Sequence, residues 1–174
     1  YNACPGFATG AIGNVVLSPS FFITDSARLV GTVVTGAVLK FTTSAGGQLS
    51  YSATAADNGK ITLNYPSGFF DTAATPVPTV AITGPSGVTA TCGAPGATSL
   101  VISLSSGSSA IPASTAVTIT FTNLKLGASA TAGNPTGMTV QTLDGDGADY
   151  NACPGFATGA IGNVVLSPSF FITD

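Results

Sequence analysis

The 174-residue chain has no histidine, no tryptophan and no glutamate, and only 6% of its residues are charged. Without histidine, no serine or cysteine has its usual general base, and no G-x-S-x-G motif is present. Without tryptophan, a common stacking platform for a sugar ring is lacking, and most aspartates are scattered singly rather than paired for glycoside hydrolysis. We therefore expect that the protein is not an enzyme.

Basic residues are equally scarce. Four lysines and arginines face seven aspartates, which gives a net charge of −3. Recognition of a phosphate backbone needs a basic patch, so we expect no nucleic-acid partner. Gly, Pro, Ser, Thr or Asn interrupts every apolar run before it reaches the roughly 18 residues of a membrane-spanning helix, so we expect no membrane insertion.

The chain contains a perfect internal duplication. Residues 1–25 read YNACPGFATGAIGNVVLSPSFFITD, and residues 150–174 repeat them without a change. Either a terminal segment has been appended a second time, or the chain is one period of a tandem array plus an overlap. We divide the chain into a linking segment (1–25), a body (26–149) and a second copy of the linking segment (150–174) that begins the next repeat.

Each copy of the linking segment carries two apolar pieces that need burial, separated by Ser-Pro-Ser. A strand added to the edge of a neighbouring sheet gains hydrogen bonds and covers that edge, so we predict that these pieces form an inter-unit strand. The alternative, that each copy is simply the first strand of its own sandwich, stays open. The predicted inter-unit residues are Val15, Val16, Leu17, Phe21, Phe22 and Ile23 in the first copy, and Val164, Val165, Leu166, Phe170, Phe171 and Ile172 in the second.

The body shows the two-residue alternation of β-strands. In residues 117–122, Val, Ile and Phe alternate with three threonines, which indicates one buried and one exposed face. Similar pieces, separated by Gly, Pro, Asn and Ser turns, predict further strands at 37–43, 48–54, 60–65, 79–83, 88–92, 99–104 and 138–143. We predict an all-β fold, an Ig-like Greek-key β-sandwich, with units joined head to tail through a shared or donated strand.

Three stretches of the body carry a family resemblance: GKITLNYPSGF at 59–69, SLVISLSSGSSAIPASTAVTITFTNLK at 99–125, and GMTVQTLDGDGAD at 137–149. Together they resemble the Ig-like β-sandwich modules repeated in very large secreted surface and appendage proteins of microbes and algae. The resemblance covers most of residues 30–149 and implies a stalk, fibre or adhesin spacer, located outside the cell or on its surface. The linking segment, with its cysteine, departs from that pattern.

The three cysteines are Cys4, Cys92 and Cys153, and the first and last are one position counted twice. In an oxidising compartment, Cys92 could pair with Cys4 or Cys153, and the remaining copy would pair in the next unit. Such a disulfide would lock the junction between units and contribute about 2–4 kcal/mol. Two reduced thiols per period are the alternative.

Asp144, Asp146 and Asp149 lie in a glycine-rich run and are the only concentration of charge. Carboxylates on such a loop suit Ca²⁺, although the complete calcium-loop pattern is absent, so a solvated turn is the alternative. We expect no other cofactor. The 25 threonines and 18 serines provide acceptors for O-linked glycans, or are simply favoured on exposed strands.

These observations favour a structural protein: a repeat unit of an extracellular filament, whose partners are neighbouring copies of itself in a helical polymer. One alternative is an adhesin or carbohydrate-binding module on a repetitive stalk, with Phe69 and Phe70 in a binding loop. Another is a pilin-like subunit whose donor segment is present twice.

Overall fold

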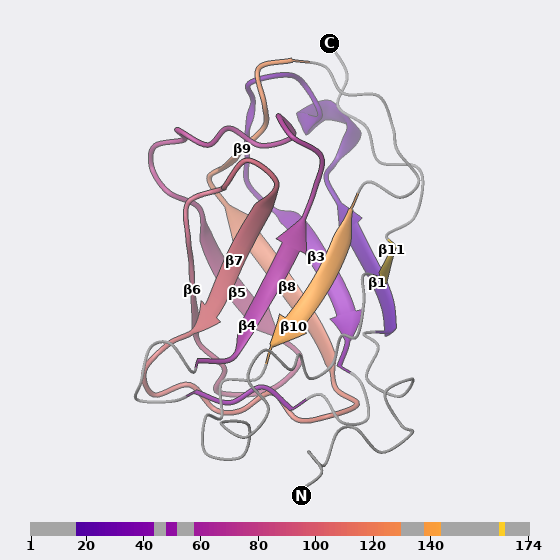
Figure 1. The fold of residues 1–174 in the computed structure, drawn as a ribbon, viewed down its shortest axis with the longest axis vertical. Coiled ribbons are helices and arrows are strands. Elements are labelled where there is room, and N and C mark those ends of the chain that lie inside the picture. The colour runs from indigo at the N-terminus through magenta and orange to yellow at the C-terminus, as the bar shows by residue number, and fades with distance from the viewer. Residues whose placement is uncertain (1–16, 44–47, 52–57, 130–137, 144–163, 166–174) are drawn as a thin grey trace, which may run out of the picture.

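Two antiparallel β-sheets face each other in the computed structural model (Figure 1), which describes residues 17–43, 48–51, 58–129, 138–143 and 164–165. The first sheet has the order β1 (Leu17–Phe22), β3 (Ala37–Thr42), β8 (Ala116–Thr122) and β5 (Thr79–Thr83). The second has the order β11 (Val164–Val165), β10 (Thr139–Leu143), β4 (Lys60–Asn64), β7 (Ser99–Leu104) and β6 (Ala90–Cys92).

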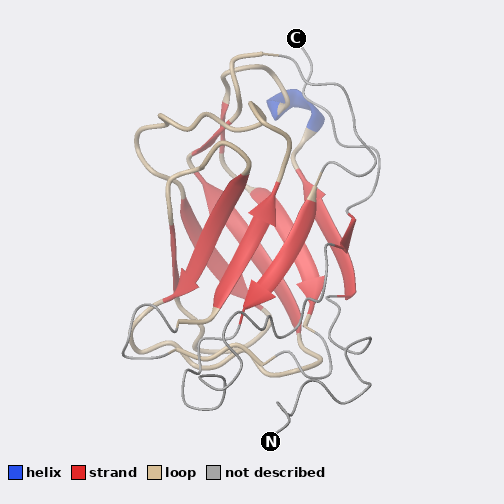
Figure 2. Cartoon of the chain, in the orientation of Figure 1, coloured by secondary structure: helices blue, strands red, loops and turns tan. Residues whose placement is uncertain are grey.

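A short ribbon and one turn complete the described part of the chain (Figure 2). The ribbon pairs β2 (Val33–Val34) with β9 (Leu124–Lys125). The only helical element among the described residues is a 3₁₀ turn, η2 (Asp25–Ala27), directly after β1. The predicted all-β, two-sheet sandwich is therefore confirmed.

Most predicted strands form, and the deviations lie at short or irregular pieces. Residues 48–51, the described part of the strand predicted at 48–54, form an isolated antiparallel bridge between Leu49 and Ile111 rather than a strand. The strand predicted at 88–92 begins two residues later, at Ala90. The β2–β9 ribbon was not predicted, because two residues per strand are too few to show an alternation.

The strand order differs from the seven-strand immunoglobulin arrangement. In that arrangement the sheets have the orders A-B-E-D and C-F-G, so the fifth strand lies between the second and the fourth. Here β10 pairs with β4, while β8 lies in the opposite sheet between β3 and β5. The resemblance to Ig-like modules thus extends to two packed antiparallel sheets, and the order of the strands is this chain's own.

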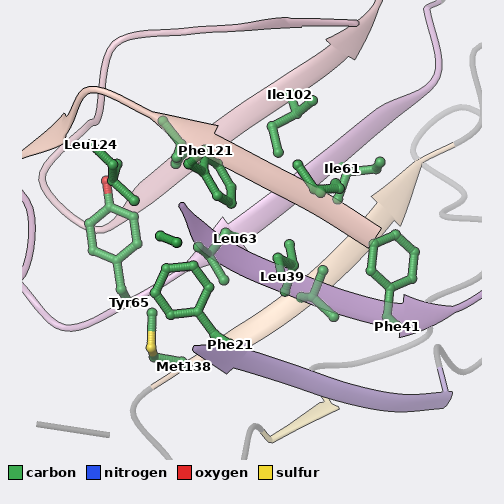
Figure 3. Packing of buried hydrophobic residues seen from close by; sticks show 14 of the residues in the cluster. Phe21, Leu39, Phe41, Ile61, Leu63, Tyr65, Ile102, Phe121, Leu124 and Met138 are labelled. Atoms are coloured by element: carbon green, nitrogen blue, oxygen red, sulfur yellow. The ribbon is translucent and has the colours of Figure 1, made fainter. Parts of the chain in front are cut away.

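The core lies between the sheets and follows from the alternation in their strands. In β8, Val117, Ile119 and Phe121 are buried while the intervening threonines are partly exposed. Figure 3 shows side chains from both sheets meeting in this layer, including Leu39 of β3 and Leu63 of β4. Burial of these apolar surfaces is the dominant stabilising contribution to such a fold.

One buried hydroxyl fixes the end of β3 to a distant loop. Thr43 is fully buried, its Oγ1 donates to the Pro112 carbonyl at 2.8 Å, and its Oγ1 accepts from the Thr115 N–H at 2.9 Å. The Thr43 N–H also donates to the Thr115 carbonyl at 3.0 Å. This one side chain therefore satisfies two backbone groups in the turn that leads into β8.

We expect Thr43→Val to destabilise the sandwich by about 1–3 kcal/mol, because it leaves the Thr115 N–H and the Pro112 carbonyl without this partner inside the protein. Thr42→Val is the matched control: this neighbouring threonine is only half-buried, so its replacement should change stability by about 0.5 kcal/mol or less. Urea unfolding of both variants tests the difference. Equal effects would contradict the role given to the Thr43 hydroxyl.

Candidate inter-unit interface

The first copy of the linking segment provides β1, the edge strand of the first sheet. It pairs antiparallel with β3, and Ser20, Phe21 and Phe22 lie opposite Lys40, Leu39 and Val38. The register shifts between Leu17 and Ser20, at the Ser-Pro-Ser sequence. Proline has no N–H to donate to the strand ladder, so within sheets it is tolerated at edge strands and at bulges. Pro19 lies at both, because β1 is an edge strand and its register shifts there.

The side chains of this strand alternate between the core and the outer surface. Phe21 is 9% exposed and Ile23 is fully buried, whereas Phe22 between them is 53% exposed. The expected burial of the apolar pieces thus holds for Phe21 and Ile23 but not for Phe22, because successive strand residues face opposite sides of a sheet. Beyond the strand, Arg28 Nε donates to the Ile23 carbonyl at 3.0 Å and holds the chain as it leaves the edge.

Phe21 enters a cluster of aromatic rings between the sheets. Its ring centroid lies 6.1 Å from that of Phe70 and 6.0 Å from that of Phe121, both in edge-to-face geometry. Phe70 in turn makes edge-to-face contacts with Tyr65 at 4.7 Å and Phe69 at 4.8 Å. Such pairs contribute about 0.5–1.5 kcal/mol each beyond the area they bury. A residue of the duplicated segment is therefore part of the central packing of the body.

The segment 65–70, which carries three rings of this cluster, is held at both of its ends. The Tyr65 hydroxyl lies 2.9 Å from the Gly96 carbonyl and 2.8 Å from the Ser99 carbonyl, and burial raises the pKa of Tyr65. Phe70 forms an isolated antiparallel bridge with Leu126. Phe69 and Phe70 are 3% and 2% exposed. They are core residues and do not offer the exposed aromatic pair that the adhesin alternative needs.

An ion pair anchors the same loop at the surface. Lys125 Nζ lies 2.8 Å from Asp71 Oδ2, and the Asp71 N–H donates to the Lys125 carbonyl at 3.0 Å. The hydrogen bond from Lys125, assisted by the Ala73 N–H, holds the pKa of Asp71 below its ordinary value. Neither this pair nor the role of Thr43 could be predicted from the sequence, because their partners are distant in sequence and no local motif specifies them.

The second copy of the linking segment provides β11, at the edge of the second sheet. Val165 lies opposite Thr139 and Val164 opposite Val140, in antiparallel register with β10. β11 contacts β1, and the two strands lie on the same side of the sandwich (Figure 1). One side of the molecule is therefore edged by the duplicated sequence in both sheets.

The two copies show complementary parts of one sequence. The described part of the first copy is its end, residues 17–25, which includes the strand on β3, and the described part of the second copy is the Val-Val pair on β10, which corresponds to residues 15–16 of the first copy. The remaining predicted inter-unit residues lie outside the described residues: Val15, Val16, Leu166, Phe170, Phe171 and Ile172.

A small hollow of about 160 Å³ lies on the outer face beside β1. It is lined by Ser20, Phe22, Val38 and Lys40. These residues form two cross-strand pairs of β1 and β3, so the hollow belongs to the interface of the linking segment with the body. The sequence does not show that they adjoin, because strand pairing between distant segments leaves no local signal.

The predicted disulfide and calcium sites fall mostly outside the described residues. Cys92 is a free, partly buried thiol whose pKa burial raises to about 12, while Cys4 and Cys153 lie outside the described residues. The calcium candidates Asp144, Asp146 and Asp149 also lie outside them. Within the described part, no three His, Cys, Asp or Glu residues are grouped to hold a metal ion.

No family model, curated protein or solved structure matches this chain. No helix among the described residues has the length and hydrophobicity to cross a membrane.

Phe21→Ala should destabilise the fold by about 3–5 kcal/mol, because it leaves a cavity beside the rings of Phe70 and Phe121 in the core. Phe22→Ala, one residue further along the same strand, should cost about 0.5 kcal/mol or less, because its side chain already faces solvent. Chemical denaturation of the two variants provides the comparison. Similar losses for both would show that β1 does not contribute Phe21 to the core in this register.

The Asp71–Lys125 pair should make stability pH-dependent. The pKa of Asp71 is lower in the folded chain than its ordinary value of 3.8, so its contribution is present above that value and is lost as the pH falls through the folded-state pKa. We expect the stability difference between the native chain and Asp71→Asn to vanish as the pH falls through the folded-state pKa of Asp71. Lys125→Met should flatten the pH dependence in the same way, and an unchanged profile in both variants would contradict the pairing.

Proposed function

We propose that this chain is a structural repeat unit of an extracellular filament, joined head to tail to further copies through the linking segment. The observation that carries the proposal is the role of β1. The first copy of the duplicated sequence is built into the sandwich as an edge strand with Phe21 and Ile23 buried. The same sequence recurs at residues 150–174, so the chain carries a second copy of a segment that this unit has already used.

The position of β11 supports the same proposal. Residues 164–165 pair with β10, so this part of the second copy lies at an edge of its own unit. An array in which each linking segment follows one sandwich and opens the next would repeat this arrangement without limit, and head-to-tail contacts that do not close generate filaments.

The chemistry of the surface suits a packed fibre. The outer faces of the first sheet carry hydroxyls where charges are usual: Thr79 and Thr83 of β5 are exposed, and Thr118 and Thr120 of β8 are partly exposed. Weak charge permits close approach of neighbouring filaments. We include O-linked glycans on these faces, and an extracellular or cell-surface location, in the proposal.

The resemblance to Ig-like modules supports this role only at the level of two packed antiparallel β-sheets, because the strand order differs from the immunoglobulin order. A disulfide through Cys92 and calcium at Asp144, Asp146 and Asp149 would stiffen the junction between units, and both remain part of the proposal. The role of the protein is mechanical, and the partners of each chain are further copies of the same chain.

Electron microscopy of the native material tests the proposal, and we expect unbranched filaments. The denatured, reduced and deglycosylated mass then separates two ways of building them. A mass many times 16.9 kDa means a covalent tandem array, and a single species near 16.9 kDa means separate chains joined by strand exchange. Only monodisperse single particles, at every concentration tested, would contradict the filament.

A further inference from the structure

We propose that the edge of β3 also accepts residues 166–172 of a second molecule of this chain, in the place that β1 occupies here. This inference rests on the proposed function and specifies its junction. One continuous segment would join two sandwiches, with Val164–Val165 on β10 of the donor and the following residues on β3 of the acceptor.

The acceptor site is already defined by β1. Residues 166–172 read LSPSFFI, as do residues 17–23, so every side chain that β1 places on the body is available from the second copy. In the register of β1, Ser169 lies opposite Lys40 and Phe170 opposite Leu39. Phe170 then takes the position of Phe21 between Phe70 and Phe121.

The structure also supplies the donor's departure point. Residues 164–165 are paired to β10 at the side of the sandwich, and residue 166 follows directly. The β3 edge of the donor is filled by its own β1, so its second copy has no vacant β3 edge within its own unit. The second copy is therefore the strand that a neighbouring molecule can use.

The energetics of this exchange follow from the identity of the two sequences. Replacing β1 by the same sequence from another molecule restores the same ladder hydrogen bonds and the same aromatic contacts. Exchange of identical elements is a low-cost route to association. Donor segment and acceptor edge are different surfaces, so each contact leaves an unused second copy at one end of the growing chain and, at the other end, a β3 edge at which β1 can again be replaced.

A pairwise crosslinking experiment tests the exchange with full-length chains in which Cys4, Cys92 and Cys153 are replaced by serine. The acceptor carries Lys40→Cys, with Phe21→Asp and Phe170→Asp to weaken both of its own strands. The donor carries Ser169→Cys. Directly opposed residues of antiparallel strands have Cα atoms about 4.5–5.5 Å apart, within the range of a disulfide. We expect a disulfide-linked band at twice the chain mass on mixing and oxidation.

Two controls define the specificity of that band. A donor with Ser167→Cys moves the thiol about 7 Å along the strand and should give little product. A donor with Ser169→Cys and Phe170→Asp should lose the band, because its strand no longer fills the aromatic cluster. If circular dichroism shows that the Phe21→Asp acceptor is unfolded, an acceptor with Phe21→Ala replaces it, and one with native Phe21 should give a weaker band.

Absence of the band, or equal bands from the Ser167→Cys and Phe170→Asp donors, overturns the proposal, because either result shows that the second copy does not enter the β3 edge in the register of β1. The outcome is independent of the filament itself. If filaments form but the crosslink does not, the proposed function is retained and the exchange between molecules is refuted. If the crosslink forms but filaments do not, the exchange is retained and the filament is refuted.

Discussion

The packing of Phe21 between the two sheets is the contact on which the rest of this structure depends. Phe21 comes from an edge strand, yet its ring meets Phe70 of a distant loop and Phe121 of the central strand β8. The edge strand β1 is therefore a part of the core and not only a cover for the edge of the sheet. Without it, the aromatic cluster has a gap and the backbone groups of β3 on that side lose their partners, which is costly in a buried layer.

The duplicated segment also addresses a general problem of open sheets, whose edges expose unpaired N–H and C=O groups. In this molecule β1 covers the edge of β3 and β11 covers the edge of β10. Both covering strands come from the same repeated sequence. The register shift at Ser-Pro-Ser interrupts β1 itself, which limits further pairing on its outer side. A filament built from such units would use one sequence both to complete each sandwich and to link it to the next.

The strands of the body could be predicted because their alternation is local. Residues 60–65, 79–83, 99–104 and 117–122 each show an apolar face in the printed sequence, and each contains a strand of the fold. Other features could not be predicted. The hydroxyl of Thr43, the Asp71–Lys125 pair and the β2–β9 ribbon join residues far apart in sequence, and no local pattern specifies their partners. At the candidate interface, the sequence predicted which residues are apolar, but not that Phe22 would remain exposed.

The sequence by itself determined that the fold is all-β, that its sandwich has one apolar face per strand, and that residues 1–25 recur at 150–174. These properties follow from the composition, from the two-residue alternation and from the identity of the two copies, and none of them depends on which residues are neighbours in space. Only the tertiary structure decided that β10 pairs with β4, that the first copy lies on β3 and that part of the second lies on β10. Strand order is decided by which distant segments together bury the most apolar surface and satisfy the most backbone groups, a property of the whole chain.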